Sequence, residues 1–233
     1  MTQNDFITKV NELGLEVTDE KLDKLNKYYE LLVSFNEKIN LTAITLKEEV
    51  YLKHFYDSLT LVKIIDFNKY NTFCDIGTGA GFPGIVIKIF FPHLKVTLID
   101  ALNKRIDFLN VVISELQLKE IETIHSRIED YGKNNRELYD IVTARAVTNL
   151  SNLLEFAIPI VKVNKYFIAM KGSNNELDTI LNALKLLNIK LEDKIEFSLP
   201  YEESKRNLIK FVKLDKTNNK YPRKFSEIKK KPL

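Results

Sequence analysis

Glycines gather at one place in this 233-residue chain. Four of its seven glycines fall within eight residues, namely Gly77, Gly79, Gly81 and Gly84. The cluster lies between an apolar run that predicts a strand over residues 72–76 and a predicted helix near residues 84–90. Glycine permits positive φ angles and lets a ligand approach main-chain amides where a strand ends. A structural turn needs one or two glycines rather than four, so the cluster predicts a ligand-binding loop.

Two cofactor classes compete for this loop. The last three glycines match the dinucleotide fingerprint, but Pro83 stands where main-chain amides would hold a pyrophosphate and has no N–H to donate. Asp75, two residues before the first glycine, would repel a pyrophosphate and could accept a hydrogen bond from the amino group of a methionine moiety. We therefore favour S-adenosylmethionine over NAD. The predicted cofactor-binding residues of the loop are Asp75, Gly77, Gly79 and Gly81.

Acidic residues follow the next two predicted strands as well. Asp100 ends the strand 96–100 and can accept hydrogen bonds from both ribose hydroxyls. NAD enzymes use the same device, and an N-cap for the following helix is the structural alternative. After the third strand, Ile128 is placed to pack on an adenine ring, and Glu129 or Asp130 to accept from its amino group. These residues predict a nucleoside site beside the glycine loop.

The fourth predicted strand ends in Thr143-Ala144-Arg145-Ala146, without the Pro-Pro-Tyr type of tetrapeptide found in amino-group methyltransferases. Methylation at C5 needs a nucleophilic cysteine, but Cys74 falls inside a strand, where a buried apolar role is expected. Guanine N7 has a lone pair and no proton, so its methylation needs positioning and no general base. We therefore predict no catalytic residue. Arg145 is expected to bind a carboxylate or phosphate bidentately, with a structural ion pair as the alternative.

The hydrophobic pattern predicts the elements that position these residues. Apolar residues at spacings of three and four predict helices up to about residue 65, and short apolar runs then alternate with helical stretches. This alternation predicts βαβ units and a mostly parallel twisted sheet. Together with the cofactor loop, it favours a Rossmann-like α/β methyltransferase fold. The expected strands are 72–76, 96–100, 122–125, 141–143 and 167–170, and the expected helices are 84–90, 103–117, 149–160 and 174–188. The runs 190–198 and 208–214 predict an antiparallel edge pair.

Charge is distributed unevenly along the chain. Residues 205–233 contain 11 Lys or Arg and 2 acids, whereas residues 1–204 contain 24 basic and 30 acidic groups. A basic ending on an acidic body predicts a polyanionic partner, and nucleic acid competes here with an acidic membrane surface. The expected division is an N-terminal helical extension (1–66), a cofactor-binding domain (67–214) and a basic C-terminal tail (215–233).

Composition limits the remaining classes of protein. Hydrophobic residues make up 45% of the chain and charged residues 29%, as in ordinary globular proteins. One cysteine cannot form an internal disulfide, a cysteine zinc cluster or the three-cysteine cluster of radical enzymes, so no metal is expected. The N-terminus has no basic region followed by an apolar stretch, and we expect a cytoplasmic monomer with no membrane partner.

Several motifs together are similar to those of one family. They are Asn36-x-x-x-Asn40-Leu41-Thr42, His54-x-x-Asp57-Ser58-Leu59, the stretch Asp75 to Gly84, Ser126-Arg127-Ile128-Glu129, Ala144-Arg145-Ala146, Lys171-Gly172 and Tyr221-Pro222-Arg223-Lys224. With them the chain resembles, nearly end to end, the bacterial 16S ribosomal RNA guanine-N7 methyltransferase G family, also called glucose-inhibited division protein B. One departure is Phe225-Ser226-Glu227-Ile228, where the family usually has a glycine and a proline.

The resemblance implies S-adenosylmethionine-dependent methylation of a guanine N7 in 16S rRNA or in a small ribosomal subunit particle. It implies cofactor contacts at Gly77, Phe82, Ile128, Glu129 and Arg145. We expect RNA contacts at Lys171, Arg223, Lys224, Lys229, Lys230 and Lys231. His54 and Asp57 are expected either to support the sheet or to contact RNA. The competing functions are an NAD-dependent dehydrogenase, for which no clear proton relay is found, and a noncatalytic RNA-binding ribosome assembly factor.

Overall fold

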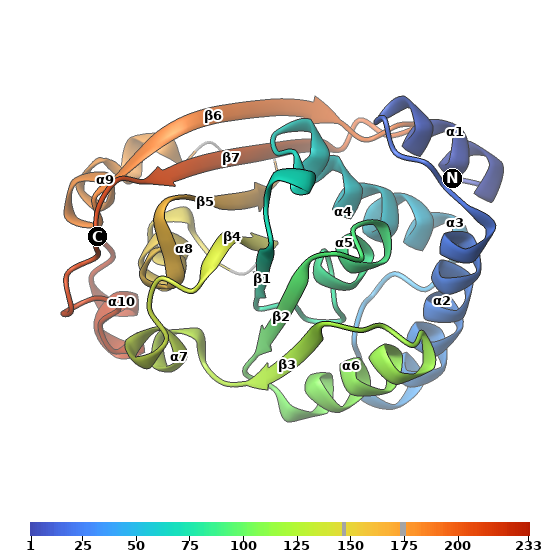
Figure 1. The fold of residues 1–233 in the computed structure, drawn as a ribbon, viewed down its shortest axis with the longest axis horizontal. Helices are drawn as coiled ribbons and strands as arrows, with labels where there is room; N and C mark the ends of the chain where they lie inside the picture. Colours follow the sequence, from blue (N-terminus) through green and yellow to red (C-terminus); the bar gives the residue numbers. More distant parts are fainter. Residues whose placement is uncertain (146–147, 173–175) are drawn as a thin grey trace.

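A seven-stranded sheet forms the centre of the computed structural model, which describes residues 1–145, 148–172 and 176–233. Its strands are β1 (Thr72–Ile76), β2 (Lys95–Asp100), β3 (Ile121–His125), β4 (Tyr139–Arg145), β5 (Val161–Lys171), β6 (Ile189–Ser198) and β7 (Lys205–Lys213). They lie in the order β3-β2-β1-β4-β5-β7-β6 (Figure 1). Strands β1 to β5 are parallel, and β7 is antiparallel to both β5 and β6. The expected parallel sheet with an antiparallel edge pair is confirmed.

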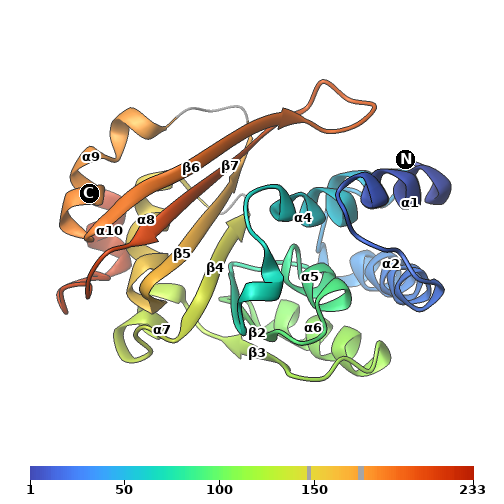
Figure 2. The same cartoon turned by 45° about the horizontal axis from the view of Figure 1, so that its top comes forward.

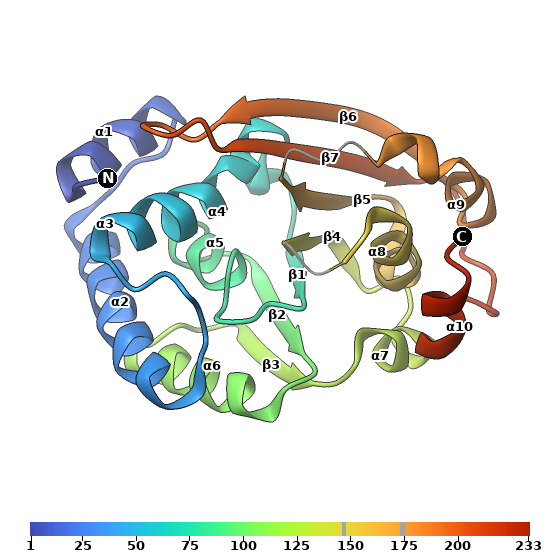
Figure 3. The same cartoon turned by 180° about the vertical axis from the view of Figure 1, so that it is seen from behind.

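Each face of the sheet has its own hydrophobic core. Successive side chains of a strand point to opposite faces, so Phe73 enters one core and Cys74 the other. Helices α5 (Gly84–Phe90) and α6 (Asn103–Glu115) cover the first face, and α8 (Leu150–Ala157) and α9 (Leu181–Leu186) cover the second. Figure 3 shows the two groups of helices on either side of the strands. Because both faces are covered at the centre of the sheet, nearly all residues of β1 and β4 are buried, as is usual for central parallel strands, whereas the edge strand β3 has no fully buried residue.

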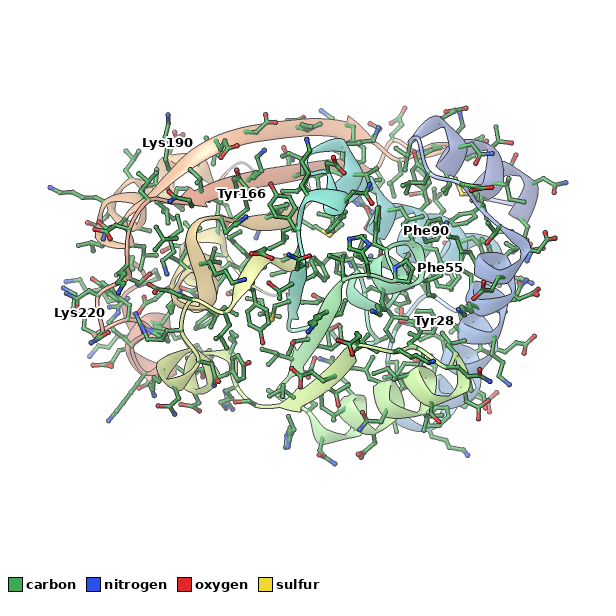
Figure 4. All side chains as sticks on the ribbon, viewed as in Figure 1. Tyr28, Phe55, Phe90, Tyr166, Lys190 and Lys220 are labelled. Carbon is green, nitrogen blue, oxygen red and sulfur yellow. The ribbon has the colours of Figure 1, made fainter. Side chains whose placement is uncertain are left out.

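The N-terminal helices add a further layer over the first face. These are α1 (Gln3–Glu12), α2 (Asp19–Ile39), and a continuous helical stretch comprising α3 (Lys47–Val50), a π-helical segment (Tyr51–Tyr56), α4 (Asp57–Leu59) and a 3₁₀ turn (Thr60–Lys63). Tyr28 of α2 and Phe55 are buried in the same core as α5 and α6, and Figure 4 shows both side chains inside the molecule. The expected N-terminal helical extension is therefore present, and it shares its core with the sheet.

The C-terminal segment also packs against the sheet domain. Helix α10 (Phe225–Lys230) lies beside α7 (Ile128–Asn134) in Figures 1 and 3. Tyr221 and Ile228 are buried, and Arg136 donates hydrogen bonds to the main-chain oxygens of Thr217 and Tyr221 at 2.6 and 2.8 Å. The tail is therefore docked along the body of the protein.

Element boundaries differ from the expected ones at several points. The strands expected at 141–143 and 167–170 extend to 139–145 and 161–171 because β4 and β5 pair with each other and with β1 and β7. The helix expected at 149–160 ends at residue 157 and continues as a 3₁₀ turn. The helix expected at 174–188 is a 3₁₀ turn at 177–179 followed by α9, and its first two residues lie outside the described ranges. Figure 2 shows the β6–β7 hairpin reaching toward the N-terminal helices, and Lys53 of the π-helical segment pairs with Glu202 of the hairpin loop.

Candidate functional site

A cavity of about 830 Å³ opens where the parallel strands end. Its volume is within the usual range for small-molecule sites, and open α/β sheets bind ligands at this edge. Residues after β1, β2 and β3 line one half, which we call the nucleoside half: Gly77, Gly79, Asp100, Arg105, Ile128 and Glu129. The other half, which we call the target half, is lined by residues from the π-helical segment and α4, from the ends of β4 and β5, and from the start of β7. They are His54, Asp57, Arg145, Met170, Lys171 and Arg206.

The glycine loop connects the two halves. Gly79 has a φ of +62° and open space where a side chain would begin, so the loop presents bare backbone to the cavity. Gly81 has a φ of +98° and packs away from the cavity: a Cβ there would lie 2.7 Å from the Tyr28 hydroxyl. Tyr28 also donates a hydrogen bond to the main-chain oxygen of Ala80. The loop therefore owes its shape both to a ligand-facing glycine and to close packing on α2.

Asp75 lies beneath this loop and does not line the cavity. Its Oδ2 accepts hydrogen bonds from Thr78 Oγ1 at 2.7 Å and from the Gly84 main-chain N–H at 2.9 Å, while its buried Oδ1 has no partner among the described residues. Complete burial raises the pKa of Asp75 to about 7, against the lowering effect of these hydrogen bonds. Asp75 thus braces the loop, and its predicted contact with the cofactor's amino group stays a prediction.

Asp100 lines the nucleoside half and is 3% exposed. Its carboxylate accepts from the main-chain N–H groups of Gly79 and Leu102, each at 2.9 Å, and from Arg105 Nη1 at 3.1 Å. Leu102 directly precedes α6, so the hydrogen bond from its N–H gives Asp100 part of the helix-capping role that was the structural alternative for this residue. One carboxylate therefore joins the glycine loop to the end of β2, at the position where a ribose would be held.

Ile128 and Glu129 begin α7 at the far wall of the nucleoside half. Ile128 is half-buried there, and Glu129 is 4% exposed. Arg127 Nη1 lies 3.8 Å from Glu129 Oε1, too far for a hydrogen bond, and this buried oxygen has no partner among the described residues. A buried acceptor without a donor is costly unless a ligand satisfies it. The carboxylate therefore fits an adenine amino group, as an adenosyl cofactor requires.

Arg145 links the end of β4 to the π-helical segment. Its Nη1 donates to Asp57 Oδ2 at 3.1 Å and to the main-chain oxygen of Lys53 at 2.9 Å, and its Nη2 lies 3.2 Å from His54 Nδ1. The Arg145 guanidinium lies 5.3 Å from the centre of the Phe82 ring, on which His54 stacks at 4.5 Å. The ion pair considered as the structural alternative for Arg145 is thus present, and it forms part of the cavity wall. Ala146, the last residue of that motif, lies outside the described residues.

The N-terminal motifs build the wall opposite the glycine loop. Asn36 Oδ1 accepts from the main-chain N–H groups of Leu41 and Thr42 at 2.6 and 2.8 Å, which fixes the turn after α2. Thr42 Oγ1 then lies 3.0 Å from His54 Nε2. Burial, assisted by the charge of Arg145, lowers the pKa of His54 to about 3, so the ring is neutral at physiological pH. His54 and Asp57 therefore form part of the cavity wall. Contact between Thr42 and His54 also joins the motif that begins at Asn36 to the motif that begins at His54.

The residues expected to contact RNA fall into two groups. Lys171 donates to the Thr148 main-chain oxygen at 2.7 Å and pairs with Glu176 at 2.9 Å. Arg223 forms a two-point ion pair with Glu155, whose side chain is fully buried, at 2.8 and 2.6 Å. The other four, Lys224, Lys229, Lys230 and Lys231, are exposed on or beside α10. Their charges are therefore available to a partner, whereas those of Lys171 and Arg223 are compensated within the chain.

Sequence patterns assigned no cavity role to several residues that line it, among them Arg206 and Phe225. Arg206 was counted only as one of the basic residues near the C-terminus, although arginine is rare here, with 6 against 29 lysines. Phe225 lines the cavity, stacks on Phe156 at 6.4 Å, and has Arg127 over its ring at 5.4 Å. Its position depends on how the tail docks, and no local sequence pattern records that.

The fold is shared with solved methyltransferases. A SAM-dependent methyltransferase from Aquifex aeolicus matches with a TM-score of 0.53 at 16% identity, over 77% of this chain and 98% of that one. A 16S rRNA adenine-N1 methyltransferase from Catenulisporales acidiphilia, solved with SAM, matches with a TM-score of 0.52 at 13% identity, over 66% of this chain and 94% of that one. The fold is thus the Rossmann-like fold that these methyltransferases share.

The family model of GidB, the rRNA small subunit methyltransferase G, matches residues 21–208, and the chain belongs to this family. Ribosomal RNA small subunit methyltransferase G of Exiguobacterium sibiricum is 51% identical, and that of Listeria monocytogenes is 47% identical, each over all of both chains. The predicted family, enzyme class and cofactor are confirmed, and the alternatives of an NAD-dependent dehydrogenase and a noncatalytic assembly factor are set aside.

Within residues 1–145, 148–172 and 176–233, no three His, Cys, Asp or Glu side chains are arranged to hold a metal ion. In the same part of the chain, no helix has the length and apolar character needed to cross a membrane.

Proposed function

We propose that this enzyme transfers the methyl group of S-adenosylmethionine to N7 of one guanine in 16S rRNA. The proposal rests on membership of the rRNA small subunit methyltransferase G family and on the chemistry of the target half. It places the enzyme in the cytoplasm as a monomer, acting on rRNA or on a small-subunit particle.

The observation that carries the N7 assignment is that the acid–base groups of the target half already have partners. Both ring nitrogens of His54 have neighbours, and a pKa of about 3 makes it a poor proton acceptor at neutral pH. Asp57 is held between two arginines, and Lys171 pairs with Glu176. An exocyclic amine would need a group to orient it and remove its proton. A ring nitrogen with an in-plane lone pair needs only to be positioned.

The nucleoside half holds the cofactor in this proposal. Asp100 accepts from the ribose hydroxyls, Ile128 packs on the adenine and Glu129 accepts from its amino group. Gly77 and Gly79 bring main-chain groups to the methionine portion, and Phe82 and Arg145 close the site toward the target half. Asp75 and Gly81 shape the loop from below.

The chain's contribution to the reaction is positioning and electrostatics. Bound S-adenosylmethionine supplies an activated methyl group on a positively charged sulfur. The glycine loop and Asp100 fix where that group lies, since the Gly79 N–H donates to the Asp100 carboxylate. Burial of the target half among Phe82, Met170 and Leu41 excludes water and orients the base for in-line attack.

The basic surface of the tail is proposed to bind the RNA backbone. Lys224, Lys229, Lys230 and Lys231 are exposed beside Phe225, which lines the cavity. Phosphate contacts of this kind supply affinity and orientation without reading sequence. We assign Lys171 and Arg223 to holding the cavity and the docked tail, because their charges are compensated by Glu176 and Glu155.

The proposal is tested by incubating the purified protein with methyl-labelled S-adenosylmethionine and unmodified 16S rRNA, either naked or in small-subunit particles. The labelled RNA is digested to nucleosides and separated by chromatography. We expect the label in 7-methylguanosine. Label in a methyl adenosine, a methyl cytidine or an N2-methylguanosine would leave the methyltransferase assignment standing and overturn the N7 assignment.

A further inference from the structure

The target half contains an arginine for which cofactor binding gives no role. Arg206 lies near the start of β7, the strand that runs antiparallel between β5 and β6. It lines the same cavity as Arg145, and its side chain is 23% exposed. Arg145 reaches the cavity from the end of the parallel strand β4, whereas Arg206 reaches it from the start of the antiparallel strand β7.

Hydrogen bonds fix the Arg206 side chain without using all of its donors. Nε donates to Asp57 Oδ1 at 3.0 Å, and Nη1 donates to Ser204 Oγ at 2.6 Å and to the main-chain oxygen of Lys205 at 3.1 Å. Nη2 has no hydrogen-bond partner within the residues that the structure describes. Guanidinium groups have five N–H donors in a rigid plane, so Arg206 is oriented by the protein and still has donors to give.

Asp57 connects this arginine to Arg145. The carboxylate is 3% exposed and shares its two oxygens between the two guanidinium groups, at 3.1 Å from Arg145 and 3.0 Å from Arg206. One negative charge therefore faces two positive charges in a concave, largely apolar site. Burial lowers the pKa of the neighbouring His54, so its ring is neutral and adds no charge. Lys53 is paired with Glu49 and Glu202. Glu49 and Glu202 do not line the cavity, so Asp57 and the two arginines that it contacts carry one net positive charge where they face the cavity, which favours an anionic ligand group.

RNA brings such a group to this position. A guanine must leave its base stack for its N7 to enter the cavity, and the phosphates on either side of it must then pass the cavity rim. Arginine is well suited to phosphate because two of its N–H groups can bind two phosphate oxygens. The carboxylate of the cofactor is the other anion near this site, and Arg145, beside the glycine loop and Phe82, lies closer to the nucleoside half.

We propose that Arg206 binds a backbone phosphate of the target nucleotide. Asp57 fixes the positions of both guanidinium groups, so that Arg206 contacts the RNA and Arg145 contacts the cofactor. This inference rests on the proposed function, because it assumes that RNA occupies the target half. It assigns the single arginine of β7 to substrate recognition and separates it from the cofactor contacts.

The test compares Arg206→Gln with Arg206→Lys and with Lys190→Gln. Lys190 is exposed on β6, outside the cavity lining, and its side chain points to the periphery in Figure 4. For each variant, KM and kcat for 16S rRNA, the salt dependence of RNA binding, and the calorimetric Kd for S-adenosylhomocysteine are measured. We expect Arg206→Gln to raise the KM for RNA about tenfold and to reduce the log–log salt slope by about one.

The remaining outcomes distinguish the explanations. We expect the Kd of Arg206→Gln for S-adenosylhomocysteine to stay within about twofold of wild type, Arg206→Lys to recover part of the RNA affinity, and Lys190→Gln to behave as wild type. A raised Kd for S-adenosylhomocysteine in Arg206→Gln would assign Arg206 to the cofactor carboxylate instead. An unchanged KM and salt slope would overturn the phosphate contact. If the wild-type enzyme methylates no RNA at all, the proposed function itself fails, independently of Arg206.

Discussion

At the scale of single residues, carboxylates in different surroundings perform different tasks. Asp100 faces the cavity and accepts hydrogen bonds from the glycine loop, whereas Asp75 lies below the same loop and is closed off from the cavity. Glu129 keeps a buried oxygen without a donor among the described residues. The sequence predicts cofactor contacts for all three acids. In the structure Asp100 and Glu129 line the cavity, whereas Asp75 holds the glycine loop from below.

Replacing Asp100 by Ala tests the nucleoside half. Loss of charge-assisted hydrogen bonds to the ribose should weaken cofactor binding by about 1 to 3 kcal/mol, as measured by calorimetry. Because Asp100 also accepts from Gly79 and Leu102, Asp100→Asn is the matched variant that keeps one acceptor oxygen. Equal affinity in wild type and Asp100→Ala, with both proteins folded, would remove Asp100 from the site. NAD should produce no binding heat in any of these proteins.

The buried carboxyl of Asp75 predicts a pH dependence of stability. Its pKa rises from 3.8 to about 7 in the folded protein because of burial, so the folded state binds a proton more tightly than the unfolded state does. The resulting stabilisation is complete below pH 3.8 and is lost as the pH rises through about 7. The unfolding free energy of wild type, measured with urea relative to Asp75→Asn, should therefore fall between these pH values and level off above them. Parallel pH profiles for the two proteins would show that Asp75 keeps its ordinary pKa.

At the scale of elements, the docked tail combines a structural and an ionic role. Changing Lys224, Lys229, Lys230 and Lys231 to Gln should lower RNA affinity and reduce the log–log salt slope by roughly 0.7 to 0.9 for each phosphate that is no longer neutralised. The affinity for S-adenosylmethionine and the melting temperature should be nearly unchanged, because these side chains are exposed. An unchanged salt slope would show that the lysines are solvated and have no part in RNA binding.

Arg223→Ala provides the contrast within the same segment. It leaves Glu155 as a buried carboxylate without its cation, which should cost about 3 to 5 kcal/mol of stability. Thermal or urea unfolding measures this loss. A fall in RNA affinity without a fall in stability would instead return Arg223 to the group of direct RNA contacts.

The elements that the sequence predicted well are those with a strong local pattern. Strand β1, α5 and the start of α6 follow from apolar runs and from the glycine cluster, because burial on both faces of a parallel sheet leaves a clear signal. Helices α7 and α10 were not predicted. Each has only six or seven residues. Helix α7 contains Gly132, and α10 has a single buried residue, Ile228, so neither shows a clear apolar periodicity.

At the scale of the whole molecule, the site is assembled from residues that are distant in the chain. Asp57 and Arg206 are 149 positions apart, and Lys53 and Arg145 are 92 apart, yet each pair is in contact. The sequence could identify the nucleoside half, since its residues follow directly after consecutive strands. It also pointed to Arg145 and Lys171 of the target half. It could not show that Asp57 and Arg206 join them, because that depends on where the N-terminal helices and the antiparallel strand β7 meet.

The central claim is that one domain binds S-adenosylmethionine in one half of a cavity and places a guanine N7 of 16S rRNA in the other. Methylation at N7 leaves a cationic purine. Borohydride reduces its five-membered ring, the reduced base is then lost from the sugar, and aniline cleaves the strand at the abasic site. The most direct measurement is therefore aniline cleavage of 16S rRNA from cells with and without this protein. We expect that one cleavage is lost in its absence, and that purified enzyme with S-adenosylmethionine restores it. An unchanged cleavage pattern, or restoration of a methyl group that resists aniline, would contradict the account.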